Sequence, residues 1–397
     1  MATSCPACGD ADVDVFYEQK GVPSHSVKLM PSRETALTFP TGDLRIAFCP
    51  SCGFVFNAAF DATLNAYDQD CEETQGFSPH FQLWIVGLAQ RVVDQLELQG
   101  KHTVEIGCGK GEFLALVAEL GGGTGTGIDP AYIPGGRLET TAADRLTFLS
   151  ELFTAEHTGL LDDAQAIAHR HTLEHIAPVA EHVRMIRSAI GDRDVPIFFE
   201  LPETLRVLRE GAFWDVYYEH CSYFTPGSLA RLMRREGFDI TDLGLEYDDQ
   251  YIVLFGRPGD GTSPVLALED DLSATATAVE QFRTEVPARI AALQERIDEE
   301  RVRGGRVVIW GAGSKGVAFL TTLGMDVRGE AAIEYAVDIN PHKQGQFMPG
   351  TGQEVVGPAF MAEYRPTLVL AMNPVYVEEI SRELAGLGVD DATVIGV

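Results

Sequence analysis

The chain has 397 residues, of which 45% are hydrophobic, and it carries a formal net charge of −29. A chain of this size and composition can bury a substantial core, which excludes wholesale disorder and suggests two to three domains. The acidic excess argues against general nucleic-acid binding, and no apolar stretch reaches the roughly 18 residues of a membrane span. The first residues lack the basic and apolar segments of a signal peptide, so we expect a cytoplasmic protein that binds neither nucleic acid nor membrane.

Residues 1–62 form the first predicted domain, a small β-rich module with four cysteines in two Cys-x-x-Cys pairs. The pairs are Cys5 with Cys8 and Cys49 with Cys52. In a cytoplasmic chain, such clustering indicates a metal site before it indicates disulfides. Zn²⁺ favours four tetrahedral thiolates, so we predict a structural Zn²⁺ without an open coordination position. The alternative is two separate knuckles or redox-active thiols.

Residues 63–258 alternate between predicted strands and helices. Residues 61–83 show no clear periodicity, but residues 81–98 carry apolar side chains at helical spacing. A strand, a glycine-rich turn and a helix follow over 102–120, and further strands are predicted within 123–129, 164–176, 195–202 and 251–258. This alternation predicts an α/β domain with a parallel sheet that is covered on both faces.

The turn at 104–113 reads VEIGCGKGEF and places glycines between a strand and a helix. Gly107, Gly109 and Gly111 let the backbone turn tightly and approach a ligand closely. The next strand ends in Asp129, whose carboxylate can accept both hydroxyls of a ribose. Because Glu105 precedes the glycines, the pattern resembles motif I of the class I methyltransferases, where the acid and glycines surround S-adenosylmethionine. A dinucleotide site would instead show G-x-G-x-x-G at a helix N-terminus.

The sequence RHTLEHI at 170–176 is similar to an H-x-L-E-H segment that lies beside cofactor and substrate in many methyltransferases. This similarity places His171 at the cofactor. The spacing of His171, Glu174 and His175 also suggests metal ligands, but a ligand site at the carboxyl end of a strand is enough to explain polar residues here. We expect Glu174 and His175 to hold the loop by hydrogen bonds.

Aromatic and titratable residues are concentrated in WDVYYEHCSYFT at 214–225. Glu219 beside His220, with Tyr217 nearby, can poise an imidazole as a general base near neutral pH. The residues themselves are equally compatible with a buried histidine–tyrosine network that only anchors a helix.

Residues 259–303 are predicted to form a linker and a long helix that Pro287 interrupts or bends. Residues 304–397 begin with a second strand and glycine-rich turn, VVIWGAGSKG at 307–316, and form a second Rossmann-like α/β domain. The residue pattern leaves three roles for this domain: a wall of the substrate cleft or an interface, a fold without a ligand, or a dinucleotide site.

The dinucleotide interpretation rests on spacing alone. Gly311, Gly313 and Gly316, followed by Asp338 at the end of the next strand, match a dinucleotide fingerprint. Lys315 or Lys343 can instead offer a cation to a diphosphate.

The order of the motifs resembles the zinc-containing sugar C-methyltransferases over nearly the whole chain: paired CPxC knuckles, motif I, RHTLEH, YxEH and a second α/β domain. The resemblance implies methylation of a nucleotide-linked deoxysugar, commonly a 4-keto sugar at C3. It implies that His220 removes the proton next to the ketone. It also implies that Tyr217 and Glu219 place the substrate and stabilise the enolate, and that the C-terminal domain lines the substrate cleft without binding NAD.

Two segments depart from the family pattern. YDQDCEETQGFSPHF at 67–81 replaces a tyrosine- and serine-rich stretch and places Cys71 where an aromatic residue is expected. Gln75 and Ser78 can still close over the cofactor. YYEH at 217–220 replaces a more usual YHEH. Both differences are expected on the wall that faces the acceptor.

The sequence therefore predicts an S-adenosylmethionine-dependent methyltransferase with a small-molecule substrate, a nucleotide-linked keto-deoxysugar that is methylated at carbon. The alternative is O- or N-methylation of another small natural-product metabolite at the same cofactor site. A nicotinamide-dependent oxidoreductase that uses 307–316 and a non-catalytic zinc scaffold are the candidates from other classes. The sequence makes no prediction of the oligomeric state.

Overall fold

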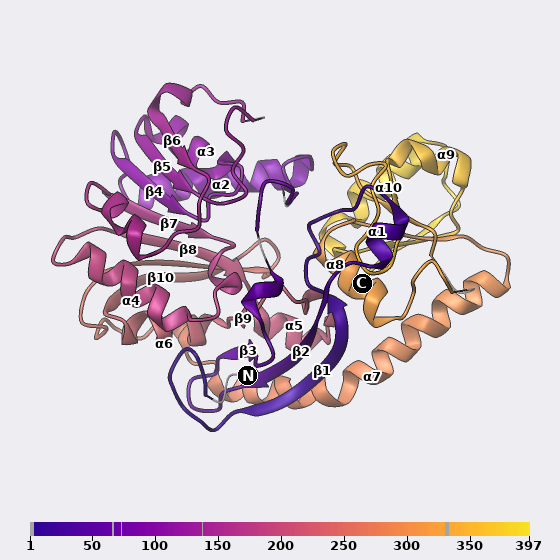
Figure 1. Ribbon diagram of the computed structural model, residues 1–397, viewed down its shortest axis with the longest axis horizontal. Coiled ribbons are helices and arrows are strands. Elements are labelled where there is room, and N and C mark those ends of the chain that lie inside the picture. Colours follow the sequence, from indigo (N-terminus) through magenta and orange to yellow (C-terminus); the bar gives the residue numbers. More distant parts are fainter. Residues whose placement is uncertain (1–3, 66, 73, 137, 330–332) are drawn as a thin grey trace.

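The computed structural model describes residues 4–65, 67–72, 74–136, 138–329 and 333–397. Two α/β lobes stand side by side, joined along one edge by the N-terminal strands and the long helix α7 (Leu272–Val302) (Figure 1). Within the described residues, no helix has both the length and the apolar character needed to cross a membrane.

The N-terminal sheet combines strands from distant parts of the chain. Its order is β1-β2-β3-β9, and all neighbours pair antiparallel. The strands are β1 (Asp14–Pro23), β2 (Thr41–Phe48), β3 (Val55–Asn57) and β9 (Ser222–Tyr223). Between β1 and β2, the chain forms α1 (Arg33–Leu37) and reaches the C-terminal lobe, where Met30 makes an antiparallel bridge with Phe347. The sheet thus joins residues from both sides of the predicted boundary at 62.

The central lobe contains a seven-stranded sheet in the order β10-β11-β8-β7-β4-β5-β6. Its strands are β4 (His102–Ile106), β5 (Thr124–Ile128), β6 (Leu146–Leu149), β7 (Ala166–Arg170), β8 (Ile197–Pro202), β10 (Phe238–Glu246) and β11 (Tyr251–Pro258). Its helices are α2 (Pro79–Gln95), α3 (Glu112–Gly121), α4 (Val179–Ile190), α5 (Thr204–Glu210) and α6 (Pro226–Arg235). The predicted α/β class is confirmed.

The edge of this sheet differs from the parallel sheet that the sequence predicted. β8, β7, β4, β5 and β6 run parallel, but β11 pairs antiparallel with both β8 and β10. The reason is the short turn between β10 and β11, in which Tyr247, Asp248 and Asp249 all have positive φ angles. So short a connection can join only antiparallel strands, because parallel strands need a long crossover.

Apolar side chains cover both faces of the central sheet. In β8, Phe199 packs into the core that contains α4 and α6 side chains such as Val183 and Leu229. The adjacent Phe198 points to the other face and packs with α2 and α3 side chains such as Leu88 and Phe113. Burial on both faces explains why the inner strands are almost continuously apolar.

The C-terminal lobe contains a five-stranded parallel sheet in the order β14-β13-β12-β15-β16. Its strands are β12 (Val307–Trp310), β13 (Tyr335–Val337), β14 (Glu354–Val356), β15 (Leu368–Ala371) and β16 (Thr393–Gly396). Its helices are α8 (Ser314–Thr322), α9 (Met361–Tyr364) and α10 (Val377–Gly386). Short 3₁₀ segments in the chain lie at Ala62–Leu64, Ala143–Arg145, Ala155–Leu161, Leu173–His175, Phe213–Asp215, Ala267–Glu269, Pro358–Phe360 and Pro374–Tyr376.

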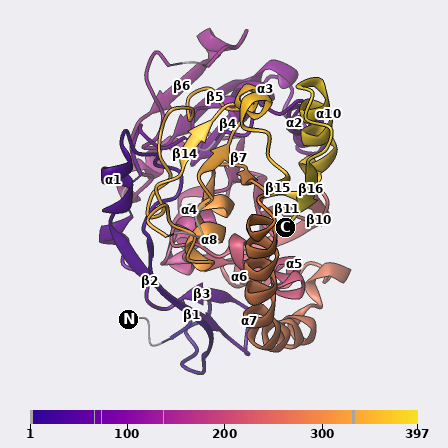
Figure 2. The same ribbon diagram turned by 90° about the vertical axis from the view of Figure 1, so that its right-hand side faces the viewer.

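Pro287 does not interrupt α7, which is one helix that bends along its length (Figures 1 and 2). A proline inside a helix removes one backbone hydrogen bond and favours a kink. Here Phe282 and Val286 are buried just before Pro287, in the core that also contains residues of β1 and α5. This packing keeps the two halves of α7 in one helix.

The carboxyl ends of the central and C-terminal sheets face one cavity of about 1560 Å³. Its walls include the loops after β4, β5 and β7, the loops after β12, β13 and β15, and residues of the 67–78 segment. Ligands of open α/β sheets bind outside the carboxyl ends of the strands. The cavity is therefore where the candidate site is to be sought.

Candidate active site

The glycine-rich turn between β4 and α3 forms one wall of the cavity. Gly107, Gly109 and Gly111 have φ angles of 73°, 53° and 87°, in the left-handed region that glycine adopts readily. A Cβ atom at Gly107 would lie 1.9 Å from the hydroxyl oxygen of Thr172, so no larger residue fits there. The turn thus brings bare backbone to the cavity wall.

Two carboxylates flank this turn and line the cavity. Asp129, just after β5, accepts hydrogen bonds from the backbone N–H groups of Gly109 (2.9 Å) and Ala131 (2.7 Å), and burial raises its pKa. Glu105 lies in β4, where burial raises its pKa to about 7 and its Oε2 has no hydrogen-bond partner. A carboxylate has about four acceptor positions, so both groups can accept further hydrogen bonds from a ligand.

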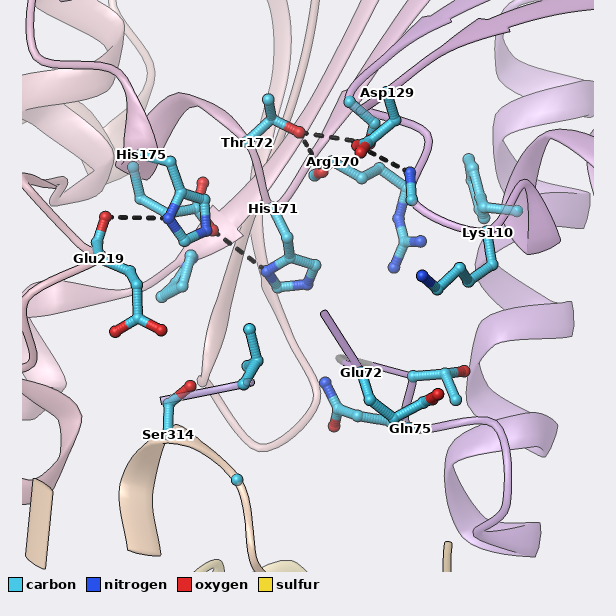
Figure 3. A pocket seen from close by; sticks show the side chains of 18 of the residues that line it. Glu72, Gln75, Lys110, Asp129, Arg170, His171, Thr172, His175, Glu219 and Ser314 are labelled. Atoms are coloured by element: carbon cyan, nitrogen blue, oxygen red, sulfur yellow. Dashed lines mark hydrogen bonds and ion pairs between the residues drawn. The ribbon is translucent and has the colours of Figure 1, made fainter. Parts of the chain in front are cut away.

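A buried ion network extends from the end of β7. Arg170 contacts both oxygens of Glu200, with Nε–Oε2 at 2.5 Å and Nη2–Oε1 at 3.0 Å, and His171 Nε2 lies 2.9 Å from Glu200 Oε1. Burial by itself would lower the pKa of His171, but the charge of Glu200 raises it to about 9. The ring is therefore an imidazolium at neutral pH, and it lies at the cavity (Figure 3).

Residues of the 67–78 segment lie across the cavity from the ion network. Gln75 is within 3.4 Å of the Tyr251 hydroxyl through Nε2 and within 3.5 Å of the Tyr376 hydroxyl through Oε1, so it contacts both lobes. Figure 3 shows Gln75 on the opposite side of the cavity from Arg170. Cys71 is buried and does not line the cavity. The sequence expectation that position 71 faces the acceptor is therefore wrong.

His220 lies on the cavity wall, two residues before β9. Its Nε2 is 3.0 Å from the Tyr217 hydroxyl oxygen, and its ring centroid is 4.9 Å from that of His175. Burial, and the neighbouring His175 ring, hold the pKa of His220 well below its ordinary value, so the imidazole is neutral. Burial also raises the pKa of Tyr217 well above its ordinary value, so the phenol stays protonated.

Glu219 is anchored from behind by the N-terminal segment. Its Oε1 accepts hydrogen bonds from the backbone N–H (2.5 Å) and the hydroxyl (2.7 Å) of Ser26, and it lies 3.4 Å from His25 Nδ1. Burial by itself would raise the pKa of Glu219, but the contacts with His25 and Ser26 lower it, so the group is a carboxylate. Sequence reasoning missed Ser26 and His25, because Ser26 lies 193 positions from Glu219 and no local pattern marks it.

The two residues expected to hold the 170–176 loop behave differently. His175 Nδ1 lies 2.9 Å from the backbone oxygen of Glu219 and 3.0 Å from the Tyr67 hydroxyl oxygen, which confirms its anchoring role (Figure 3). The prediction for Glu174 is wrong. Neither of its carboxylate oxygens makes a hydrogen bond, and Oε1 has only an ion-pair contact at 3.4 Å from His171 Nδ1.

The four N-terminal cysteines come together as the sequence predicts. Cys5 Sγ lies 3.6 Å from Cys52 Sγ, Cys8 Sγ lies 3.5 Å from Cys49 Sγ, and all four sulfur atoms lie within 4.8 Å of one another. A tetrahedral zinc with Zn–S bonds of about 2.3 Å would separate its sulfur ligands by about 3.8 Å. The geometry therefore fits a four-thiolate zinc. None of these four residues lines the cavity.

Asp338, the acid beside the glycine-rich turn of the C-terminal lobe, already accepts three hydrogen bonds within the protein. Asp338 accepts hydrogen bonds from the backbone N–H groups of Ala312 (3.0 Å) and Asn340 (2.9 Å), and from Lys343 Nζ at 3.2 Å. In a dinucleotide site, the acid at this position accepts the ribose hydroxyls. The Lys343 ammonium group takes one of the acceptor positions that remain on Asp338 after its two backbone hydrogen bonds, which argues against the dinucleotide interpretation.

Polar contacts across the cavity join the two lobes. Lys315 Nζ lies 3.0 Å from Asp215 Oδ1, and the side-chain amides of Gln250 and Asn373 make two hydrogen bonds, of 2.9 and 3.1 Å. Residues of the central lobe and of the C-terminal lobe therefore form the cavity as one site. The predicted site residues Glu105, Gly107, Gly109, Asp129, His171, Gln75, Tyr217, Glu219 and His220 all line it.

Models of two known domain families match the two lobes of the chain. Residues 84–243 match the model of a methyltransferase domain, and residues 259–395 match that of a C-methyltransferase C-terminal domain. The C-methyltransferase NovU of Streptomyces niveus is 28% identical over 295 residues, which cover 71% of this chain and 68% of NovU.

Solved structures that resemble the chain include two methyltransferases with bound S-adenosylhomocysteine. The 1,6-didemethyltoxoflavin-N1-methyltransferase of Burkholderia thailandensis is 17% identical, with a TM-score of 0.33 over 44% of this chain and 79% of its own. The magnesium protoporphyrin IX methyltransferase of Synechocystis PCC 6803 is 14% identical, with a TM-score of 0.36 over 45% of this chain and 84% of its own.

Proposed function

We propose that this chain is an S-adenosylmethionine-dependent methyltransferase that methylates a carbon atom next to a ketone in a nucleotide-linked deoxysugar, a proposal supported by the matched methyltransferase domains and the C-methyltransferase relative. The observation that carries the proposal is the placement of a neutral, buried His220 in the same cavity as the glycine-rich turn and Asp129. A neutral imidazole can accept a proton from an acidic carbon, and the glycine turn can hold the methyl donor next to it.

The cofactor is proposed to lie on the glycine-rich turn. The backbone of Gly107 and Gly109, which both line the cavity, would face its methionine part, and the Oε2 atom of Glu105, which lacks a hydrogen-bond partner, would accept a hydrogen bond from its ammonium group. Asp129 would accept the ribose hydroxyls with its remaining lone pairs. His171 and Gln75 would close the site from two further sides. Bound S-adenosylmethionine supplies a methyl group on a sulfonium, which is already strongly electrophilic.

His220 is proposed to act as the general base, with Tyr217 as its partner. If Nε2–H of His220 donates to the Tyr217 oxygen across their 3.0 Å contact, Nδ1 is left as the proton acceptor. The phenol hydrogen of Tyr217 is then free to donate to the oxygen of the developing enolate. Glu219, fixed by Ser26, would help to place the substrate.

The nucleotide part is proposed to lie against the C-terminal lobe. The cavity volume of about 1560 Å³ exceeds the roughly 300–1,000 Å³ of a usual small-molecule site, so it has room for a cofactor and a sizeable acceptor together. The start of α8 lines this wall beside Lys315 and Lys343. Helix N-termini and lysines both favour phosphate groups.

We also propose that Cys5, Cys8, Cys49 and Cys52 hold one structural Zn²⁺. Four thiolates would leave no position for substrate, so the ion would contribute folding free energy rather than chemistry. Cys49→Ser should therefore abolish stoichiometric zinc and lower the melting temperature, with Cys71→Ser as a control that keeps the zinc. A Cys49→Ser protein with full zinc and unchanged melting would contradict this assignment.

Proton exchange tests the base and the reaction class together. With S-adenosylhomocysteine in the site and D₂O as solvent, the wild type should exchange the α-proton of a dTDP-linked 4-keto-deoxysugar, as measured by NMR. His220→Ala should lose this exchange and methyl transfer but should keep its affinity for S-adenosylhomocysteine. Exchange at the parent rate in His220→Ala would remove His220 as the base. Methyl transfer without any exchange in the wild type would point to O- or N-methylation.

Calorimetric titration tests the ligand classes separately. We expect binding of S-adenosylhomocysteine and of dTDP, and no binding of NAD, because Lys343 occupies Asp338. If S-adenosylhomocysteine binds and dTDP does not, the acceptor carries no thymidine nucleotide.

A further inference from the structure

The excursion between β1 and β2, residues 24–40, contacts the candidate site at one end and the C-terminal lobe at the other. Its base is closed by a hydrogen bond of 2.9 Å from the backbone N–H of Ser24 to the carbonyl oxygen of Pro40. The next two residues, His25 and Ser26, are buried. α1 lies further along the excursion, and Figure 1 shows it against the C-terminal lobe. One short segment therefore contacts two parts of the molecule that meet at the cavity.

At its inner end, the excursion fixes the side chain of Glu219. Ser26 donates two hydrogen bonds to Oε1 of this carboxylate, one from its backbone N–H at 2.5 Å and one from its hydroxyl at 2.7 Å. His175 Nδ1 lies 2.9 Å from the backbone oxygen of Glu219, so the residue is held at both its side chain and its backbone. Because Glu219 directly precedes His220, a displacement of Glu219 also displaces the proposed base.

At its outer end, the excursion is hydrogen-bonded to the C-terminal lobe. Met30 and Phe347 exchange two backbone hydrogen bonds, of 2.9 and 2.8 Å. Arg33 donates from Nε to the carbonyl oxygen of Gly352 at 3.2 Å, and its guanidinium lies 5.6 Å from the centre of the Phe347 ring. These contacts tie the excursion to the same lobe whose loops after β12, β13 and β15 line the cavity.

The segment between the two ends of the excursion is short. Ser26 and Met30 are four positions apart, and a fully extended chain spans at most about 3.3–3.6 Å per residue, or roughly 14 Å over four residues. The segment is also held from the side, since the carbonyl oxygen of Val27 accepts a hydrogen bond of 3.0 Å from the backbone N–H of Glu72. A movement of the C-terminal lobe is therefore passed to Glu219, and a misplacement of about 1 Å can cost about 100-fold in rate.

We propose that the excursion is a positioning element in which Ser26 aligns Glu219, and with it His220, to the substrate that the C-terminal lobe holds. The inference rests on the proposed function, because it takes Glu219 and His220 as the residues that act on the acceptor. The alternative is that the excursion only stabilises the fold of the C-terminal lobe. That role does not explain why its buried end donates two hydrogen bonds to a carboxylate of the cavity.

Amide hydrogen exchange over residues 214–223, followed by mass spectrometry, tests the coupling without any substrate. Arg33→Ala removes a contact between the excursion and the C-terminal lobe and should speed this exchange severalfold. Arg306→Ala is the matched control in the same lobe and should leave the exchange unchanged. The Arg306 guanidinium also donates to a carbonyl oxygen and lies 5.5 Å from the centre of an aromatic ring, both of Tyr364. No effect of Arg33→Ala, or an equal effect of the two variants, would overturn the inference.

A double-mutant cycle tests whether Ser26 acts through Glu219. The readout is α-proton exchange of a dTDP-linked 4-keto-deoxysugar in D₂O, measured by NMR with the protein saturated with S-adenosylhomocysteine. Ser26→Ala should slow this exchange about tenfold and keep the affinity for S-adenosylhomocysteine, because it removes a hydrogen bond to a buried carboxylate. The same change in a Glu219→Ala protein should have an effect of less than about twofold. Ser26→Thr, which keeps the hydroxyl, should retain most of the rate. Equal losses in the two backgrounds would leave Ser26 with a structural role only.

The two experiments separate this inference from the proposed function. If the wild type neither exchanges nor methylates the keto sugar, while Arg33→Ala speeds amide exchange and Arg306→Ala does not, the sugar substrate is wrong and the coupling stands. If the wild type exchanges the α-proton but Arg33→Ala leaves amide exchange unchanged, the proposed function stands and the coupling is wrong. Equal rates of α-proton exchange in the wild type and Ser26→Ala would also overturn the positioning role.

Discussion

The two glycine-rich turns of this chain, at 104–113 and 307–316, have almost the same local architecture. They differ in whether the acid beside the turn is free to bind a ligand. Asp129 Oδ2 and Oδ1 accept from the backbone N–H groups of Gly109 and Ala131, at 2.9 and 2.7 Å. Asp338 repeats this arrangement with Ala312 and Asn340, at 3.0 and 2.9 Å.

The difference between the turns is one side chain. Lys343 Nζ lies 3.2 Å from Asp338 Oδ2, whereas the Lys110 ammonium near Asp129 donates to the backbone oxygen of Ala131 instead. A glycine fingerprint with an acid on the next strand therefore specifies the shape of a nucleotide site. Whether the acid can still accept a ribose depends on a residue that the fingerprint does not include.

The largest expected effect is at the first glycine of the central-lobe turn, which is compared with the second glycine of the C-terminal turn. Gly107→Ala should lower S-adenosylhomocysteine affinity by roughly 100-fold or more, because its positive φ and a Cβ 1.9 Å from Thr172 both oppose the change. Gly313→Ala is the matched control, since its φ is −111° and the nearest atom to its Cβ is Lys343 Nζ at 3.9 Å. Calorimetry on both variants measures this. A similar loss of S-adenosylhomocysteine affinity in Gly107→Ala and Gly313→Ala would contradict the proposed difference between the two turns.

Substitution of Asp129 should weaken S-adenosylhomocysteine binding, whereas substitution of Asp338 should not. Asp129→Asn should reduce S-adenosylhomocysteine affinity by about tenfold or more, because a charge-assisted hydrogen bond to a ribose is worth about 1.5–3 kcal/mol. Asp338→Asn should leave that affinity unchanged and lower only the melting temperature, since it weakens the contact with Lys343. An Asp338→Asn protein with weakened cofactor binding would show that the second acid also serves the first site.

Substitution of Lys343 tests whether this side chain alone prevents a ligand from binding at the turn at 307–316. Lys343→Met should lower the free energy of unfolding by about 1–2 kcal/mol, since it leaves a buried carboxylate with one partner fewer. It should also give the C-terminal lobe a weak affinity for adenosine that the parent lacks. Titration in saturating S-adenosylhomocysteine isolates this second site. If Lys343→Met does not bind adenosine, other features of the turn prevent ligand binding.

The smallest expected effect concerns pH and the ion network of Arg170, His171 and Glu200 in the central lobe. Glu200 raises the pKa of His171 to about 9 from an unfolded value near 6.5. The stabilising contribution of this pair is therefore complete below about pH 6.5 and is lost as pH rises through 9. Because His171 is partly exposed, we expect about 1 kcal/mol. The melting temperature of the wild type should fall across this interval more steeply than that of His171→Gln; parallel profiles would exclude a charged His171.

Local features of the candidate site could be predicted, whereas its long-range partners could not. The paired cysteines, the glycine turn and Asp129 are recognisable because each depends on residues close together in the sequence or on regular strand–helix alternation. Ser26 behind Glu219 depends on a contact between distant segments, which no sequence period reveals. The role of Glu174 is not predictable for a related reason: the spacing in RHTLEHI indicates which residues share a loop, but the burial of the Glu174 oxygens is a property of the folded cavity.

The fold was predictable to a similar extent. Alternating strands and helices gave the two α/β lobes, but the antiparallel edge at β10 and β11 depends on three left-handed residues in one turn that have no glycine among them. The continuity of α7 through Pro287 depends on packing of Phe282 and Val286, which outweighs the local preference of proline. In both cases, tertiary contacts decide the outcome.

The pairing of β9 with β3 has a consequence for building chimeras of this protein. Val55 pairs with Tyr223 and Phe56 with Ser222, directly after the segment that carries Tyr217, Glu219 and His220. Exchanging residues 1–62 with those of a relative would give the recipient a foreign neighbour for its own β9 and would disturb the nearby His220. The natural unit of exchange is discontinuous and consists of the N-terminal segment together with residues 217–223.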